Sequence, residues 1–595
     1  MQSWIHTSID RKRQAMRTTI QRTLAFAVFV LGPAADSTYG GATKYIDSPP
    51  LAKVIKQGVV PVREDGAMQL PIITWGGDIA TILANGSAKN TVAGSIFDSQ
   101  GMKFSLKRED DFTKQIGAYI RGDSAYLRCT LGMLNQAIEA LEDPRVKPVV
   151  IGQLTYSVGG DVLVVKSNIK TPADLKGKTI VLQAYGPHVD YLTRVLSDAG
   201  INLSDVKIKW VKDLTGSDDS PAAALRSDPS IDAAFMISPD AAEITSNGSV
   251  GTGAEKSVKG AHVLMSTKTA SRIIVDVYAV RSDYFQTHKT EVASFAHALL
   301  MAQEKLAILM RDSAAQKAQY NQLMTAAATI LLDSPQAVAD VKGLYGDCEY
   351  VGFVGNVNTF TSQTFPRRFS VLQDEIQSGL MGLGLIGSKV AVETAGLDYD
   401  ALKQGLTQTA ASETPKFQSS EVAKVMAQRS EQGTLKDNQL FEFEVFFKPN
   451  QATFSPDAYA TQFDEVIKRA AIYAGAIITV EGYADPTGYC DAKAKGQPSL
   501  VLSRIKQSAN NTSLNRAVQV REAIVNYAKS KNVALDPSQF TTMGHGISDP
   551  KTGTTPDGEP ARPTSKEAAY SNMRCELRIV NVEAESVWTP DGGGK

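Results

Sequence analysis

Two strand-to-helix junctions carry the residue types best suited to holding a small molecule. Each places an apolar run of strand length before a glycine-containing turn and a helical stretch, at residues 70–82 and 179–199. The first turn of a helix exposes unpaired N–H groups with partial positive charge, so both junctions suit an anionic oxygen of a solute. The candidate solute-binding residues are Trp75, Gly76, Gly77, Gln183, Tyr185, Gly186 and His188.

Each of these residue types has a physical role at such a site. Trp75 would form a flat wall, the glycines would allow close backbone approach, and the tyrosine and histidine would add hydrogen bonds. We expect the carboxylate of Asp78 to cap the first helix instead of binding solute. Arg128 and Asp161 are further polar candidates, with no motif behind them. The alternative is that both junctions are ordinary turns.

The sequence lacks the patterns typical of an enzyme or a metal centre. Its six His never fall in a metal-ligand spacing, and no Ser-His-Asp or Cys-His pattern is evident. GLGLIG at 382–387 matches the dinucleotide fingerprint but follows a helical stretch instead of a strand. With 62 Lys+Arg against 63 Asp+Glu, the chain has no basic field for nucleic acid. We therefore expect no catalysis, cofactor, metal or nucleic-acid partner.

Strand-length apolar runs alternate with helical periodicity from about residue 70 to residue 240, and the pattern turns helical from about 289 to 410. Such alternation predicts parallel sheets that hold ligands at the carboxyl ends of their strands. The expected strands are 70–75, 149–154, 162–166, 179–183, 206–210 and 233–237, and an expected helix covers 189–199.

TPADLKGKTIVLQAYGPHVDYL, at 171–192, resembles a segment of periplasmic solute-binding proteins of ABC transporters, the type that includes nitrate, sulfonate and thiamine-precursor binders. GGDVLVVKSNI (159–169) and SIDAAFMISPDA (230–241) resemble neighbouring segments of that family. The resemblance implies a two-lobed α/β module that closes on a small anionic solute and delivers it to an ABC permease. Thiamine-precursor synthases resemble the same fold, so an enzyme is an alternative, which the missing catalytic pattern opposes.

The carboxyl-terminal region predicts a separate α+β domain in the order βαβαββ. The expected strands are 441–447, 477–482, 540–546 and 575–582, and the expected helices are 459–473 and 516–531. Five blocks resemble, in order, the OmpA C-terminal family of peptidoglycan-binding domains. They are FFKPNQATFSPDA (446–458), VEGYADPTG (480–488), SLNRAVQVREAI (513–524), MGHGISDP (543–550) and NMRCELRI (572–579).

The OmpA resemblance implies a ligand, the diaminopimelate side chain of peptidoglycan, whose free end is zwitterionic. Asp485 would take its ammonium and Arg516 its carboxylate, with Asn572 and Arg574 supporting the pocket. The sequence departs from the family at Ala484, where Thr is usual, and by an insert at 490–511. Arg504, inside that insert, competes with Arg516 for the role. A Cys490–Cys575 disulfide is an open possibility beside this site.

The amino terminus has the three parts of a secretory signal: a basic stretch, LAFAVFVL at 24–31, and small residues up to Ala35. It predicts export to the periplasm and cell envelope. The expected organisation is signal 1–35, extension 36–67, solute-binding domain 68–406, linker 407–438, peptidoglycan-binding domain 439–585 and tail 586–595. The alternative function is a structural envelope protein without a transport ligand.

Overall fold

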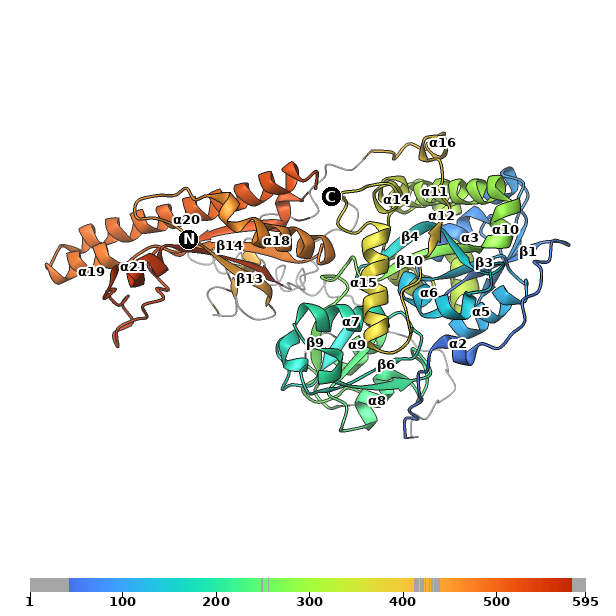
Figure 1. The fold of residues 1–595 in the computed structure, drawn as a ribbon, viewed down its shortest axis with the longest axis horizontal. Helices are drawn as coiled ribbons and strands as arrows, with labels where there is room; N and C mark the ends of the chain where they lie inside the picture. The colour runs from blue at the N-terminus through green and yellow to red at the C-terminus, as the bar shows by residue number, and fades with distance from the viewer. Residues whose placement is uncertain are drawn as a thin grey trace, which may run out of the picture. The chain divides into compact units, whose positions relative to one another are not determined.

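The computed structural model describes residues 42–247, 250–254, 256–410, 417, 422, 424–426, 428, 429, 432, 439–533 and 535–580. The predicted signal at 1–35 and tail at 586–595 lie outside the described residues, as does most of the predicted linker at 407–438. Figure 1 labels the elements of the α/β module, coloured blue to yellow, and of the carboxyl-terminal domain, coloured orange to red.

The first lobe of the α/β module is built on a sheet of strand order β11-β4-β10-β3. Both β3 and β4 run antiparallel to β10, while β1 and β2 form a separate parallel pair. The prediction of a parallel sheet is therefore wrong for this lobe, apart from the β1–β2 pair and the short parallel pairing of β12 with β4. The strands are β1 (Met68–Ile72), β2 (Phe104–Arg108), β3 (Tyr126–Thr130), β4 (Pro148–Ser157), β10 (Val275–Arg281), β11 (Cys348–Tyr350) and β12 (Glu393–Thr394).

Helix α11 (Lys289–Arg311) is the central helix of this lobe. Its Phe295 stacks on Phe97 and meets Tyr126 in the apolar core. In the part of the chain that the structure describes, α11 is the one helix long and apolar enough to cross a membrane, and 56% of its apolar window is buried inside the protein. That burial identifies it as a core helix of the lobe.

The second lobe has the strand order β7-β6-β8-β5-β9. Its β6 is parallel to β7 and β8, as the alternating pattern predicts, whereas β5 is antiparallel to β8 and β9. The prediction fails at β5 and β9 because these strands lead directly to and from the first lobe. The strands are β5 (Asp161–Val165), β6 (Thr179–Gln183), β7 (Lys207–Val211), β8 (Ala233–Ile237) and β9 (His262–Ser266).

Helix α15 contacts both α6 of the first lobe and α7 of the second. The remaining helices of the module are α2 (Leu51–Val54), α3 (Asp78–Ala84), α4 (Ile96–Ser99), α5 (Phe112–Ile120), α6 (Leu131–Ala137), α7 (Val189–Asp198), α8 (Pro221–Ser227), α9 (Ser238–Ile244), α10 (Ser282–Thr287), α12 (Lys317–Leu332), α13 (Val338–Gly346), α14 (Gly352–Phe360), α15 (Phe369–Gly382) and α16 (Tyr399–Leu402).

Two chain crossings join the lobes, at 158–160 between β4 and β5 and at 267–274 between β9 and β10. Thr267 ties them together, because its Oγ1 accepts the N–H groups of Gly159 at 2.9 Å and Asp161 at 3.2 Å. Gly159 has a φ of +149°, a conformation that L side chains rarely adopt. The crossings thus form one hydrogen-bonded hinge.

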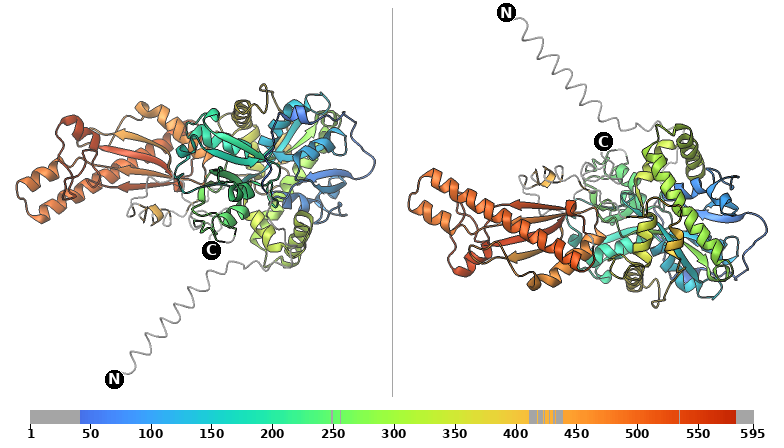
Figure 2. Two further views of the ribbon diagram at one scale, coloured as in Figure 1. Left: turned by 90° about the horizontal axis from the view of Figure 1, so that it is seen from below. Right: turned by 90° about the horizontal axis from the view of Figure 1, so that it is seen from above.

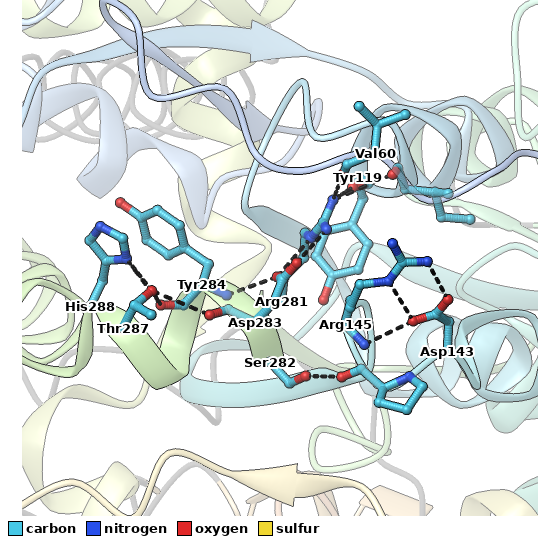
Figure 3. A network of polar contacts seen from close by, with 12 residues as sticks. Val60, Tyr119, Asp143, Arg145, Arg281, Ser282, Asp283, Tyr284, Thr287 and His288 are labelled. Carbon is cyan, nitrogen blue, oxygen red and sulfur yellow. Dashed lines mark hydrogen bonds and ion pairs between the residues drawn. The ribbon is translucent and has the colours of Figure 1, made fainter.

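The extension before β1 packs on both lobes. Ile46 pairs with Trp210 of β7 in the second lobe. On the first lobe, buried Arg281 donates from Nη1 to the carbonyl of Val60 at 2.8 Å and to that of Tyr119 at 2.9 Å (Figure 3). Arg281 thereby holds the extension against the end of α5.

Replacing Arg281 by leucine should destabilise the module. The change removes hydrogen bonds to the Val60 and Tyr119 carbonyls and the ion pair with Asp283 from a buried position, so we expect the free energy of unfolding to fall by about 3 kcal/mol in a thermal melt. Arg145→Leu is the matched control in the same region, because Arg145 is 54% exposed and pairs locally with Asp143; we expect less than about 1 kcal/mol there. Equal losses in the two variants would contradict this assignment.

The carboxyl-terminal domain has a four-stranded sheet of order β13-β16-β14-β15, parallel only between β14 and β15. The predicted strand at 477–482 coincides with β14, but the predicted helix at 516–531 begins earlier, at Ser499, because the insert extends α20 and forms α19 beside it (Figure 2). The elements are β13 (Gln439–Phe446), β14 (Ile477–Gly482), β15 (Phe540–Gly544), β16 (Arg574–Val580), α18 (Ala460–Ile472), α19 (Thr487–Ala494), α20 (Ser499–Ser530) and α21 (Lys566–Asn572).

Candidate functional sites

The junction after β1 directs Trp75 toward the hinge. Its Nε1 donates to Thr155 Oγ1 at 3.1 Å, and a Cβ on Gly160 would lie 2.6 Å from its ring. The glycines beside it serve packing: a Cβ on Gly76 would lie 2.0 Å from the Leu344 carbonyl oxygen. Gly76 and Gly77 therefore seat the tryptophan against the protein, instead of leaving space for a solute as predicted.

A buried ion-pair network lies behind Trp75. Arg128 donates from Nε to Asp78 Oδ1 at 3.1 Å and from Nη1 to Asp276 Oδ1 at 2.9 Å. Asp276 also accepts from Thr155 Oγ1 at 2.7 Å. The predicted cap role of Asp78 is wrong, because its carboxylate is fully buried against a guanidinium. Arg128 is likewise committed to two carboxylates.

The junction after β6 does not bring its polar residues to Trp75 in any contact of the described residues. Gln183 Nε2 donates to the Lys212 carbonyl at 3.2 Å, and Tyr185 Oη donates to the Pro49 carbonyl at 2.7 Å. A Cβ on Gly186 would lie 2.3 Å from Gln183 Oε1. These three residues hold the extension and the lobe edge, so their predicted role in solute binding finds no support in the geometry.

His188 and Asp161 do come together at the hinge. The two side chains are 0% and 7% exposed, and His188 Nε2 lies 2.6 Å from Asp161 Oδ1. His188 Nδ1 is buried with no hydrogen-bond partner among the described residues. Because Asp161 follows Gly160, this pair lies close to the tryptophan wall.

Asp190, in the first turn of α7, is a residue that sequence reasoning missed. It is 3% exposed, and neither carboxylate oxygen has a hydrogen-bond partner among the described residues. A Cβ on Gly132, in α6 of the other lobe, would lie 2.5 Å from its carboxyl carbon. Burial raises the pKa of Asp190 to about 7 and nearby Asp161 adds to the rise, while the backbone N–H groups of Asp190 and Tyr191 and the charge of Arg367 lower it. An acid in the first turn after the His188 junction is the available sequence signal.

Asp347, just before β11, is a second missed acid at the hinge. Its Oδ2 accepts from Ser238 Oγ of the second lobe at 3.0 Å, and its side chain lies beside Gly160. Burial raises the pKa of Asp347 to about 6, whereas nearby Lys268 lowers it. The groups gathered between the lobes are thus mainly acidic, which opposes the predicted anionic solute.

In the carboxyl-terminal domain, Arg516 and Asp485 lie near each other without a direct ion pair among the described contacts. Arg516 is 2% exposed and donates from Nε to the Gln451 carbonyl at 3.0 Å and from Nη1 to that of Tyr483 at 3.2 Å. Burial lowers the pKa of Arg516, while Asp485 opposes the change. Asp485 Oδ1 accepts from Thr487 Oγ1 at 3.0 Å.

The other residues predicted for this site form its supports. Asn572 Nδ2 donates to Thr552 Oγ1 at 3.2 Å, which fixes the loop after β15. Arg574 stacks at 3.9 Å on the ring of Tyr483, whose carbonyl accepts from Arg516. Arg504 is exposed on the insert part of α20, so the buried position belongs to Arg516.

The possible Cys490–Cys575 disulfide is not formed in the structure. All four thiols are free, including Cys490 and Cys575. Cys575 is fully buried in β16, whereas Cys490 Sγ donates to the Pro560 carbonyl at 3.3 Å. The two side chains therefore contribute to separate parts of the domain. In the described ranges, no group of three His, Cys, Asp or Glu residues is suited to a metal ion.

Comparison with known proteins adds a family match. Residues 147–307 match the family described as NMT1/THI5 like. This segment runs from the start of β4 through the second lobe and into α11. It includes both chain crossings. No curated protein sequence matches the chain significantly.

Solved structures with some likeness to this chain include two sulfonate binders and an enzyme. The periplasmic aliphatic sulphonate binding protein of Escherichia coli is 15% identical, covering 55% of this chain and 91% of its own, with a TM-score of 0.38. The alkanesulfonate-binding protein of Xanthomonas axonopodis pv. citri, bound to MOPS, is 16% identical; the match covers 55% of this chain and 97% of that protein, with a TM-score of 0.37. A desulfurization enzyme is also 16% identical; the match covers 55% of this chain and 95% of that enzyme, with a TM-score of 0.33.

Asp190→Asn should stabilise the solute-free protein at neutral and alkaline pH. The folded-state pKa of Asp190 is raised from 3.8 to about 7, so ionising this carboxyl opposes folding increasingly as pH rises between those values. We expect the variant to exceed the wild type by about 2 kcal/mol at pH 8, and this advantage to shrink by pH 5, in urea unfolding. If the variant is less stable than the wild type at pH 8, the result would contradict the assignment of Asp190 as a buried carboxylate without a partner.

Proposed function

We propose that this chain is an exported solute-binding protein of an ABC-type uptake system, anchored to peptidoglycan by its carboxyl-terminal domain. The observation that carries the proposal is the gathering of Trp75, the Asp161–His188 pair and Asp347 around the Gly159–Gly160 crossing. A small molecule bound there would touch both lobes. The NMT1/THI5-like match covers this crossing and supports the same reading.

The hinge explains how binding would be coupled to lobe closure. The lobes are joined through the crossings at 158–160 and 267–274, which Thr267 holds together. Rotation about this point would separate Asp347 from Ser238 and Asp190 from Gly132 while leaving each sheet intact. A solute that contacts both lobes would favour the closed arrangement, which a permease would then recognise.

A thermal melt of the full-length mature protein tests solute binding. Ligand that binds only the folded state stabilises it by about 2.7 kcal/mol at a hundred times its dissociation constant. Against a panel of anions, amines, amino acids and vitamins we expect at least one hit, weakened tenfold or more by Trp75→Ala. Tyr185→Phe is the control, because its hydroxyl is committed to Pro49, and binding should be unchanged. If the protein is folded and no compound in the panel raises its melting temperature, the result would contradict a transport role.

The proposed peptidoglycan site rests on the separation of two opposite charges. Arg516 is held by two backbone carbonyls and keeps Nη2 without a partner among the described residues, while Asp485 is partly exposed nearby. A ligand that carries both an ammonium and a carboxylate could form charge-assisted hydrogen bonds with Asp485 through the ammonium and with Arg516 through the carboxylate. The free end of a diaminopimelate side chain has this chemistry, as the OmpA-like motifs imply.

Co-sedimentation with purified peptidoglycan tests the anchor. We expect the full-length protein to sediment with diaminopimelate-containing peptidoglycan, and Asp485→Asn to lower the bound fraction at least tenfold. Asp491→Asn removes a neighbouring acid that instead pairs with Arg562, so it should bind as the wild type does. If the two variants bind equally, Asp485 has no role in the anchor.

A structural envelope protein without a transport ligand remains the second candidate. One observation favours it: Gly76, Gly77 and Gly186 serve internal packing, so close backbone approach by a solute is not needed to explain them. If this candidate is correct, the protein binds peptidoglycan and no compound in the solute panel raises its melting temperature. The two measurements above therefore separate the candidates.

A further inference from the structure

We infer that the solute bound between the lobes carries a cationic nitrogen, which donates hydrogen bonds to Asp190. This inference rests on the proposed solute-binding function and specifies its ligand class. It differs from the prediction of an anionic solute, which the motifs of the two junctions favour.

Asp190 supplies the main observation. Both of its carboxylate oxygens are buried without a hydrogen-bond partner among the described residues, at the contact between α7 of the second lobe and Gly132 of the first. A buried carboxylate without a donor is costly, so such groups in proteins are normally paired. The N–H groups of Asp190 and Tyr191 and the charge of Arg367 favour the ionised form, but burial outweighs them and still raises the pKa. A positively charged donor on a solute would stabilise the ionised form further.

His188 supplies a second and separate observation. Its Nε2 is engaged with Asp161, while its Nδ1 is buried with no partner in the described part of the chain. With the proton on Nε2, the imidazole donates to Asp161 and leaves Nδ1 as an acceptor. In that tautomer Nδ1 and the two Asp190 oxygens are acceptors on residues two positions apart in the chain, and each can accept from an N–H donor of a solute. One ammonium or amidinium group carries several.

The protein's own cations near this place are already engaged. Arg128 is shared by Asp78 and Asp276, and Arg367 donates to Glu375 and to the Arg272 carbonyl. Lys268 lies beside Asp347 at the Gly159 crossing. Within the described ranges, no side-chain cation forms a direct ion pair with Asp190; Arg367 is near enough to lower its pKa but pairs with Glu375.

The Asp190 carboxylate already occupies the position at which an anionic solute would bind. The amino-terminal turns of α6 and α7 carry partial positive charge, and the Asp190 carboxylate lies where these turns meet. A sulfonate or nitrate would have to approach that carboxylate together with Asp161, and like charges at close range repel strongly in a buried site. Trp75, by contrast, suits a cation, because the face of an indole ring attracts positive charge.

Isothermal titration of the solute-free, full-length mature protein tests the charge of the solute. Two probe sets share one apolar frame each and differ only in charge: butylamine, butanesulfonate and butanol, and phenethylamine, phenylethanesulfonate and phenylethanol. We expect an amine to bind at least tenfold more tightly than its sulfonate and alcohol. Asp190→Asn should weaken that binding at least tenfold although it stabilises the free protein, whereas the exposed Asp65→Asn should leave it unchanged.

The outcomes separate this inference from the proposed function. Tightest binding of a sulfonate or an alcohol would overturn the cationic solute and leave solute binding in place. If none of the six probes binds, the broader melting panel decides: a cationic hit lost in Asp190→Asn supports the inference, and a neutral or anionic hit overturns it alone. No hit in either experiment overturns both proposals.

Discussion

The guanidinium of Arg128 is the contact on which the interlobe site depends. It holds Asp78 at the start of α3 and Asp276 at the start of β10, and Asp276 in turn fixes Thr155, which accepts from Trp75. A buried ion pair is stable only when its groups satisfy one another, so this chain of contacts permits little rearrangement. The position of Trp75 is therefore set by a buried network of side chains that lies behind it.

The carboxyl-terminal domain uses a comparable arrangement. Tyr483 accepts Arg516 through its carbonyl and stacks on Arg574 through its ring, while Arg574 pairs with Glu576. Glu481 lies 2.6 Å from Arg578 Nη1. Burial alone would raise the pKa of Glu481, but the adjacent His545 and Arg578 side chains hold it at about 2. In both modules, paired buried charges fix the side chains around the proposed sites.

Local patterns predicted much of the secondary structure and little of the interlobe site. The strands at 179–183 and 233–237 were predicted with their observed bounds, because short continuous apolar runs indicate strands buried on both faces. The long antiparallel strand β10 was missed, since its partners β3 and β4 are far away in sequence. Of the predicted solute residues, Trp75 and His188 lie at the hinge, while Gln183, Tyr185 and Gly186 contact the extension and one another.

The sequence by itself determined the division into an α/β module and a carboxyl-terminal α+β domain, because strand and helix periodicities and short motifs are local properties of the chain. It also marked Asp485 and Arg516 as neighbours through ordered motifs. Only the tertiary structure decided the charge between the lobes. Asp190 meets Gly132 across two lobes, and whether a carboxylate is paired or left open depends on which distant segments pack around it.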